Sequence, residues 1–138
     1  MTTTTAPTTT TPTQAQVTAQ IAKELVELCR KGQNLEAIER FYSPDIVSTE
    51  GCEMPGGMPR TMRGIESIRG KNKWWLDNHT IHASTVDACY TSVEKFAVAY
   101  SIDATFKPTG KRHKMSEVGV YTVTDGKISH EEFLYQGC

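Results

Sequence analysis

The sequence of 138 residues lacks any segment that would anchor it in a membrane or mark it for export. No apolar run approaches the roughly 20 residues that a transmembrane helix needs. The first 14 residues, MTTTTAPTTTTPTQ, have neither a basic start nor an apolar central run, so they do not form a secretory signal. We therefore expect a cytoplasmic protein with no membrane partner.

Cysteines are few, and no pair has C-x-x-C spacing. They are widely scattered: Cys29, Cys52, Cys89 and Cys138. Without an export signal, this pattern favours reduced thiols and argues against a zinc site. His79 and His82 in HTIH have ligand-like spacing, but they have no nearby cysteine or third histidine. Because first-row metal sites need three or four convergent ligands, we expect no metal and no cofactor.

An excess of basic charge is also missing, since the net charge is −1. The densest basic run, GKRHK at 110–114, stands beside the turn signal KPTG, which is typical of a solvated hairpin tip. A nucleic-acid-binding surface needs a basic face with interleaved aromatic residues, and the sequence has none. We expect no nucleic-acid partner.

The Thr/Pro-rich start has too little apolar surface to offset the entropy of ordering it. We interpret residues 1–16 as a disordered tail. Residues 17–138 are enough for one domain with its own core and too few for two.

Helical spacing of apolar residues appears in three segments of the first half. The pattern predicts helices over 17–32, over 35–42 with Asn34 as N-cap, and over 64–78 despite Gly70. Between the last two, IVSTEG predicts a short strand, and CEMPGGMPRTM predicts a Gly/Pro/Met loop. Because glycine pairs permit large backbone swings, we expect this loop to be a mobile flap.

After residue 78 the pattern changes to the alternation of β-strands. We expect strands within 79–90, 92–106, 113–123 and 127–136, with TDGK as the turn between the last two. Helices followed by antiparallel strands predict an α+β fold with the helices on one face of a sheet.

Strand parity adds some detail. Phe96, Val98, Tyr100 and Ile102 are uniformly apolar at alternate positions, so this set should face the helices. Periodicity alone does not choose the inward set of the last strand. The two sets are Ser129, Glu131, Phe133 and Tyr135, and Ile128, His130, Glu132 and Leu134.

Three stretches carry a resemblance to a known family: GQNLEAIERFYSPDIVSTEG, GIESIRGKNKWW and GVYTVTDGKISHEEFLY. From Val17 onward the chain resembles the SnoaL-like branch of the nuclear transport factor 2-like superfamily. The resemblance implies a cystatin-like α+β barrel, a cone in which a strongly curved antiparallel sheet wraps around about three N-terminal helices. It also implies a pocket at the open end and a homodimer formed through the outer sheet face.

The superfamily includes ketosteroid isomerases, whose general base lies a few residues beyond a Y-x-x-D motif. The matching motif is Tyr42-Ser43-Pro44-Asp45, and the base position falls on Glu50. The isomerase's two oxyanion donors fall near Val26 and Gly119, neither of which has a side chain that can donate. The resemblance therefore implies a base without the isomerase's oxyanion hole.

The superfamily also includes epoxide hydrolases, which use an Asp–Arg–Asp set. Those positions fall near Phe96, Val98 and Phe133, so the set is absent. The fold thus implies a pocket without fixing its chemistry.

The resemblance also assigns pocket residues. Glu117 shares strand parity with Gly119 and should line the cone, and the last strand should turn Glu131 inward. The expected catalytic acids are Glu50, Glu117 and Glu131. The expected ligand contacts are Trp74, Phe96, Val98, Tyr100, Tyr121, Phe133 and Tyr135.

Carboxyl groups buried in an apolar cavity have raised pKa values and can shuttle protons near neutral pH. The hypothesis is therefore a cofactor-independent isomerase, cyclase or dehydratase that acts on a small apolar or aromatic carbonyl compound. Glu50 would be its base, with Glu117 or Glu131 as partner acid. Two alternatives stay open: a carrier of an apolar ligand that does no chemistry, and a dimerisation domain with a vestigial pocket. The sequence does not identify a substrate or a reaction.

Overall fold

Helix α1 (Gln14–Arg30) starts earlier than its apolar spacing predicts, because Thr13 caps it. The Gln16 amide donates to the Thr13 hydroxyl over 3.2 Å, and the Thr13 amide donates to the Gln16 side chain over 2.9 Å. The last three residues of the predicted tail, 14–16, are therefore helical. The computed structural model describes residues 10–136, so most of the predicted tail lies outside the described residues.

Two shorter helices complete the helical layer, α2 (Asn34–Phe41) and α3 (Ile65–Asn78). Helix α2 begins at Asn34 with Gln33 in the cap position, and Gln33 makes no capping side-chain bond. The prediction of Asn34 as N-cap is therefore wrong. Helix α3 continues through Gly70, as predicted. A short 3-10 turn (Pro55–Gly57) lies within the predicted Gly/Pro/Met loop.

The sheet has six strands in the order β2-β1-β6-β5-β4-β3. Their bounds are β1 (Tyr42–Thr49), β2 (Thr61–Arg63), β3 (His79–Thr91), β4 (Lys95–Phe106), β5 (Lys111–Thr124) and β6 (Lys127–Leu134). The predicted α+β class is confirmed, and the sheet is mixed, because one of its strand pairs is parallel. Strand β1 runs parallel to β6, because no hairpin joins the two strands and the long connection between them permits either direction. Strand β2 was not predicted, because a strand of three residues is too short to show the alternation of apolar and polar side chains.

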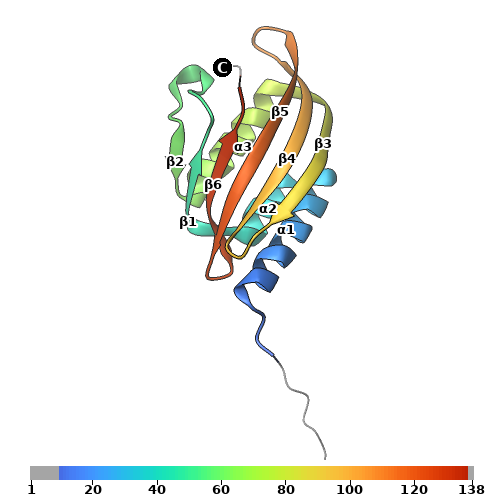
Figure 1. The fold of residues 1–138 in the computed structure, drawn as a ribbon. Coiled ribbons are helices and arrows are strands. Elements are labelled where there is room, and N and C mark those ends of the chain that lie inside the picture. Colours follow the sequence, from blue (N-terminus) through green and yellow to red (C-terminus); the bar gives the residue numbers. More distant parts are fainter. Residues whose placement is uncertain (1–9, 137–138) are drawn as a thin grey trace, which may run out of the picture.

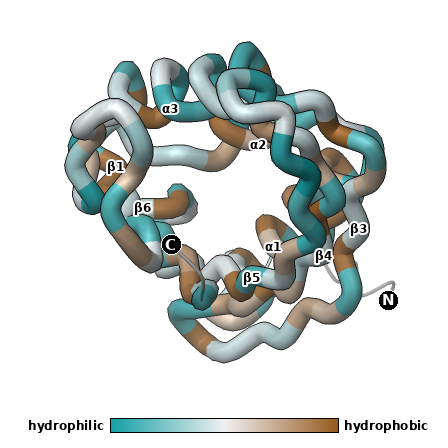
Figure 2. Tube along the Cα trace, turned by 90° about the horizontal axis from the view of Figure 1, so that it is seen from above, coloured by the Kyte–Doolittle hydropathy of each residue, from teal (hydrophilic) through white to brown (hydrophobic). Residues whose placement is uncertain are grey.

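The strands curl around the helices (Figure 1). Helix α1 lies against β3 and β4, while α3 lies against β1 and β2. Register shifts within β3 and at the end of the β5–β6 pair are the irregularities that bend an antiparallel sheet. Seen from above, α3 closes one side of a ring, and β6, β5 and β4 form much of the opposite side (Figure 2).

Strand parity on β4 is confirmed, because Phe96, Val98 and Tyr100 are buried against the helices. On β6 the inward set contains Glu131, which is 3% exposed. Glu132 and His130 are exposed on the outer face. From Glu131 onward the inward set is therefore the one that the resemblance implied, whereas Ile128 of the other set is fully buried on the far side of a register shift.

Gly119 on β5 is required by the ring of Tyr121. A Cβ at position 119 would lie 2.8 Å from the Tyr121 hydroxyl and 2.9 Å from a ring carbon. The ring is held in this position, because it is 3% exposed and stacks on Phe96 at 4.7 Å. The aromatic ring thus fills the space that a side chain at 119 would occupy.

We expect Gly119→Ala to lower the free energy of unfolding by about 1–3 kcal/mol, as overpacking of a well-packed core usually does. The matched control is Gly70→Ala in α3, where no heavy atom lies within 4 Å of the added Cβ. That control should be neutral or stabilising by up to about 1 kcal/mol, since alanine favours helix. Urea unfolding measures both. Equal stability of Gly119→Ala and the natural chain would contradict this account of the Tyr121 ring.

Not every cysteine is a free thiol. Cys52 is disulfide-bonded, so the expectation of reduced thiols is wrong at this position, while Cys29 and Cys89 are free. Cys138 lies outside the described residues. Sequence spacing could not anticipate this, because it does not tell which scattered cysteines the fold brings together. The cytoplasmic location stays a prediction, without the support that reduced thiols would have given it.

Within residues 10–136, no helix combines the length and apolar character that a membrane crossing requires.

Candidate functional site

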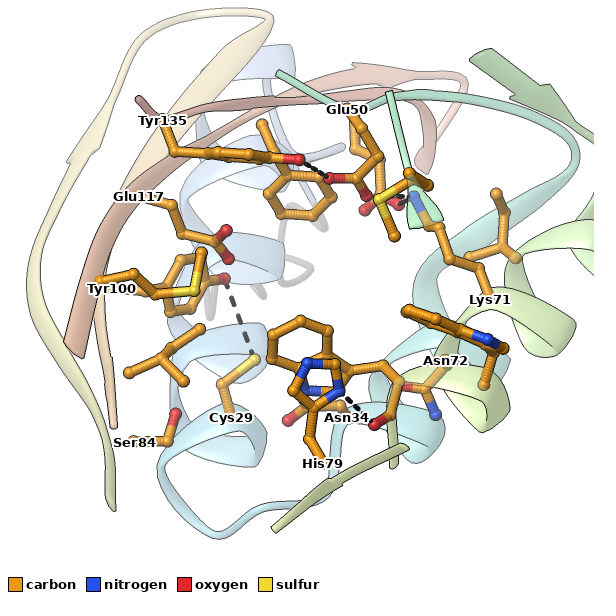
Figure 3. Close-up of a pocket in the computed structure, with 18 of the residues that line it drawn as sticks. Cys29, Asn34, Glu50, Lys71, Asn72, His79, Ser84, Tyr100, Glu117 and Tyr135 are labelled. Carbon is orange, nitrogen blue, oxygen red and sulfur yellow. Dashed lines mark hydrogen bonds and ion pairs between the residues drawn. The ribbon is translucent and has the colours of Figure 1, made fainter. Parts of the chain in front are cut away.

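A cavity of about 390 Å³ lies between α3, the inner face of the sheet and the loop after β1. Figure 3 shows Glu117 and Tyr100 on one side of it and Lys71 and Asn72 on the opposite side. The loop contributes residues 52–55 to the lining. This places the predicted flap beside the cavity, and its mobility stays a prediction.

Most of the site residues expected from the sequence lie on this cavity. All three acids line it, as do Trp74, Tyr100, Tyr121, Phe133 and Tyr135. Phe96 and Val98 do not line it. They are 2% and 0% exposed and belong to the hydrophobic core, and their expected contact with a ligand stays a prediction. Strand parity gives the face of a residue but not its depth, and these two lie under the helices, deeper than Tyr100.

Glu50 is held by two partners from other elements. The Lys71 ammonium lies 2.7 Å from its Oε1, and the Tyr135 hydroxyl donates to its Oε2 over 3.0 Å. Both charged side chains are nearly buried, at 11% and 10% exposed. In return, burial and the neighbouring Glu50 raise the pKa of Tyr135 to about 12. Glu50 is therefore a fixed, ion-paired carboxylate.

Glu131 is the most buried of the three acids, and three side chains from two other elements, β1 and α3, contact its carboxyl group. The Ser48 hydroxyl donates to its Oε1 over 2.7 Å, the Tyr42 hydroxyl donates to its Oε2, and Lys71 lies 4.0 Å away. Burial raises the pKa of Glu131, and the charge of Lys71 and the two hydroxyl donors oppose that rise. Glu131 is thus built into a network that ties β1, β6 and α3 together.

Glu117 differs from both, because within residues 10–136 no hydrogen bond or ion pair holds its carboxyl group. It projects from β5 into the cavity (Figure 3). Burial raises its pKa to about 7, and repulsion from Glu50 and Glu131 adds to the rise, while Lys71 opposes it. A carboxyl group with this pKa exchanges its proton readily at neutral pH.

A pair of tyrosines lies next to Glu117. Tyr100 is its direct partner across the β4–β5 register, so their side chains share the inner face. The Tyr100 and Tyr121 hydroxyls are 2.7 Å apart, and the Cys29 sulfur lies 4.0 Å from Tyr100. Burial raises the pKa of both tyrosines, so both hydroxyls keep their protons. When two hydroxyls hydrogen-bond to each other, one of their two protons forms that bond and the other can be donated to a third acceptor.

The remaining wall is aromatic. His79 stacks on Trp75 with ring centroids 3.7 Å apart, and its Nδ1 donates to the Trp75 carbonyl over 2.9 Å. Trp74 and Phe106 pack edge-on or tilted around the same imidazole. Burial lowers the pKa of His79, so it is neutral near pH 7. This wall offers flat apolar surface to a ligand.

Sequence reasoning missed Lys71, the residue that organises the acids. Its signal was available: Ile68, Lys71 and Trp75 are spaced i, i+3 and i+7, so the lysine stands on the apolar stripe of α3. A lysine in such a position needs a buried partner, and the base position Glu50 was the obvious candidate.

The chain belongs to the SnoaL-like domain family, whose model matches residues 16–135. No curated protein matches it. Its fold is that of the nuclear transport factor 2-like proteins, as the resemblance implied.

Solved structures agree with this assignment. A protein from Mesorhizobium loti, described as a proposed SnoaL-like polyketide cyclase, is 41% identical over 85% of this chain and 97% of its own, with a TM-score of 0.79. A proposed isomerase from Bacillus subtilis is 15% identical, with coverages of 91% and 90% and a TM-score of 0.69. An NTF2-like protein from Burkholderia xenovorans is 17% identical, with coverages of 88% and 91% and a TM-score of 0.72. At such low identity the last two bear on the fold alone. The homodimer stays a prediction.

Proposed function

We propose that this SnoaL-like protein binds an apolar or aromatic carbonyl compound and catalyses proton transfer at the carbon beside the carbonyl, with Glu117 as the base. The observation that carries the proposal is the contrast among the three acids. Glu50 and Glu131 are held by donors from other elements, whereas Glu117 faces the cavity with a pKa of about 7. A general base should have no fixed hydrogen-bond or ion-pair partner, and its pKa should lie near the working pH. Glu117 meets both conditions.

This assignment moves the base away from Glu50. The Glu50 carboxylate is held by the Lys71 ammonium at 2.7 Å and by the Tyr135 hydroxyl at 3.0 Å, so both of its oxygens already have partners within the protein. Glu50 instead fixes Lys71 and raises the pKa of Glu117 through repulsion. It remains part of the site as a positioning residue.

Proton abstraction beside a carbonyl leaves negative charge on the carbonyl oxygen, and a donor must stabilise it. Tyr100 is placed for this task, because it is the partner of Glu117 in the β4–β5 register. Its hydroxyl also hydrogen-bonds to the Tyr121 hydroxyl. Base and donor on neighbouring strands suit a substrate in which the acidic carbon adjoins the carbonyl. Isomerisation, aldol-type cyclisation and elimination of water can all begin with this step, and none of them requires a cofactor.

The proposal is tested with 2-tetralone, a bicyclic aromatic ketone whose α-protons exchange with solvent. We expect the natural chain to accelerate deuterium exchange in D₂O, followed by NMR, and Glu117→Gln to lose this acceleration by about a hundredfold or more. The matched control is Glu132→Gln, which alters an exposed acid on the outer face of β6.

Each other outcome has a distinct meaning. Full exchange by Glu117→Gln together with its loss in Glu50→Gln would return the base to Glu50 and refute the assignment. Binding of 2-tetralone without acceleration by the natural chain would favour the non-catalytic carrier.

A further inference from the structure

The lining of the cavity carries an excess of negative charge. Four glutamates contribute to it against a single lysine: Glu50, Glu53, Glu117 and Glu131, with Lys71. The Lys71 ammonium lies 2.7 Å from Glu50 and 4.0 Å from Glu131, so this lysine is already paired within the lining before any ligand arrives. No cationic lysine or arginine on the described lining remains for an anionic ligand.

Resting on the function proposed above, we infer that the cavity selects an uncharged carbonyl compound, such as a ketone, ester, lactone or amide, and rejects the carboxylate form of the same skeleton. The discriminating residue is Glu117. Its carboxyl group lies on the same cavity as Glu50 and Glu131, and both acids repel its charge. The proposed reaction alone does not require this selectivity, because proton abstraction is chemically possible on an acid as well as on its ester.

The charged groups around Glu117 come from three elements. Glu50 follows β1, Glu131 projects from β6, and Lys71 projects from α3, and these are the three groups whose charge acts on Glu117. Two histidines, His79 and His113, also line the cavity. His79 is neutral near pH 7, and His113 is exposed at the outer part of β5. An entering carboxylate would therefore meet repulsion that no free cation offsets.

Burying a charge without a partner is unfavourable, and a nearby like charge makes it worse. A carboxylate ligand could enter only if Glu117 took up a proton, and its affinity would then fall as pH rises past the point at which Glu117 ionises. A ketone carries no charge into the cavity, and its oxygen can accept from Tyr100 whatever the state of Glu117. This difference in proton uptake separates the two ligand classes.

The test uses two probes of nearly equal shape, 2-acetylnaphthalene and 2-naphthoate, in which a methyl group replaces the charged oxygen. Equilibrium dialysis at pH 5.5 to 8.5 measures both dissociation constants while the naphthoate stays ionised. At pH 8 we expect the ketone to bind the natural chain at least about tenfold more tightly. Above pH 7 the naphthoate affinity should fall about tenfold per pH unit, and the ketone affinity should fall by less.

The decisive variant is Glu117→Gln, which keeps the shape of the side chain and removes its charge. It should abolish most of the pH dependence of naphthoate binding, whereas Glu132→Gln should leave that dependence unchanged. At pH 8, equal or tighter binding of naphthoate by the natural chain would overturn the inference. Tighter binding of 2-naphthylmethylamine than of the ketone would also overturn it, because the lining would then select a cation.

Failure of this inference is distinguishable from failure of the proposed function. If the ketone binds and exchanges its α-protons through Glu117 while naphthoate binds equally well at pH 8, only the selectivity is wrong. If neither probe binds at any pH, the cavity is not a site for such compounds, and both proposals are overturned.

Discussion

Replacing Lys71 with methionine is expected to lower the free energy of unfolding by about 3–5 kcal/mol, the usual cost of removing one partner from a buried ion pair. The lysine is 10% exposed and donates to Ser48 over 2.6 Å and to Glu50 over 2.7 Å. Without it, the neighbouring carboxylates of Glu50 and Glu131 have no cation between them. Methionine keeps much of the volume, so the loss reports charge rather than packing.

The matched control is Lys73→Met, two residues further along α3. Lys73 also pairs with an acid, lying 2.6 Å from Asp77, but the two side chains are 77% and 59% exposed. Exposed pairs contribute between about 0 and 1 kcal/mol, so this variant should be nearly neutral. The Lys71→Met defect should also shrink as pH falls, because burial raises the pKa of Glu131 and protonation of this group removes part of the unpaired charge. Urea unfolding at pH 5 and pH 8 measures both effects. Equal losses in the two variants would show that Lys71 does not organise the acids.

The fold was largely predictable because its signals are local. The apolar residues Phe96, Val98 and Tyr100 alternate with small or polar ones, which predicts a strand with its apolar face buried. Strand β4 is such a strand. The pairing of β1 with β6 was not predictable, since it depends on a contact between residues more than 80 positions apart. The early start of α1 was readable from Thr13 and Gln16, which form a capping box that apolar periodicity ignores.

The site was predictable in its position and less so in its chemistry. Family resemblance placed Glu50, Glu117 and Glu131 near one another, and all three line the cavity. Which acid is free depends on Lys71, which stands on the apolar stripe of α3 and to which sequence reasoning assigned no role. An ion pair between α3 and the residue after β1 arises only when the helix packs on the sheet. The roles of the acids therefore follow from tertiary contacts that neither spacing nor parity contains.

Neutralising Glu117 is expected to stabilise the fold, and the gain should depend on pH. The pKa of this carboxyl group is about 7 in the folded state, against an ordinary value of 4.5. Between those values the folded state holds a proton that the unfolded state has released, so the stability of the natural chain falls as pH rises from about 4.5 to 7. Below this window the group makes no difference, and above it the full cost of a buried, partly repelled charge is present.

Glu117→Gln removes that cost, so its free energy of unfolding should exceed that of the natural chain by up to about 3 kcal/mol at pH 8 and by little at pH 4. Denaturant unfolding of both chains across this range measures the difference. Glu132→Gln supplies the control, because its carboxyl group faces outward and its removal should leave the pH profile unchanged. A variant that gains stability while losing proton exchange would identify Glu117 as a group kept for chemistry at the expense of stability. A constant difference between pH 4 and pH 8 would instead mean that Glu117 ionises in the fold as it does in water, and the proposed base would then have no raised pKa to work with.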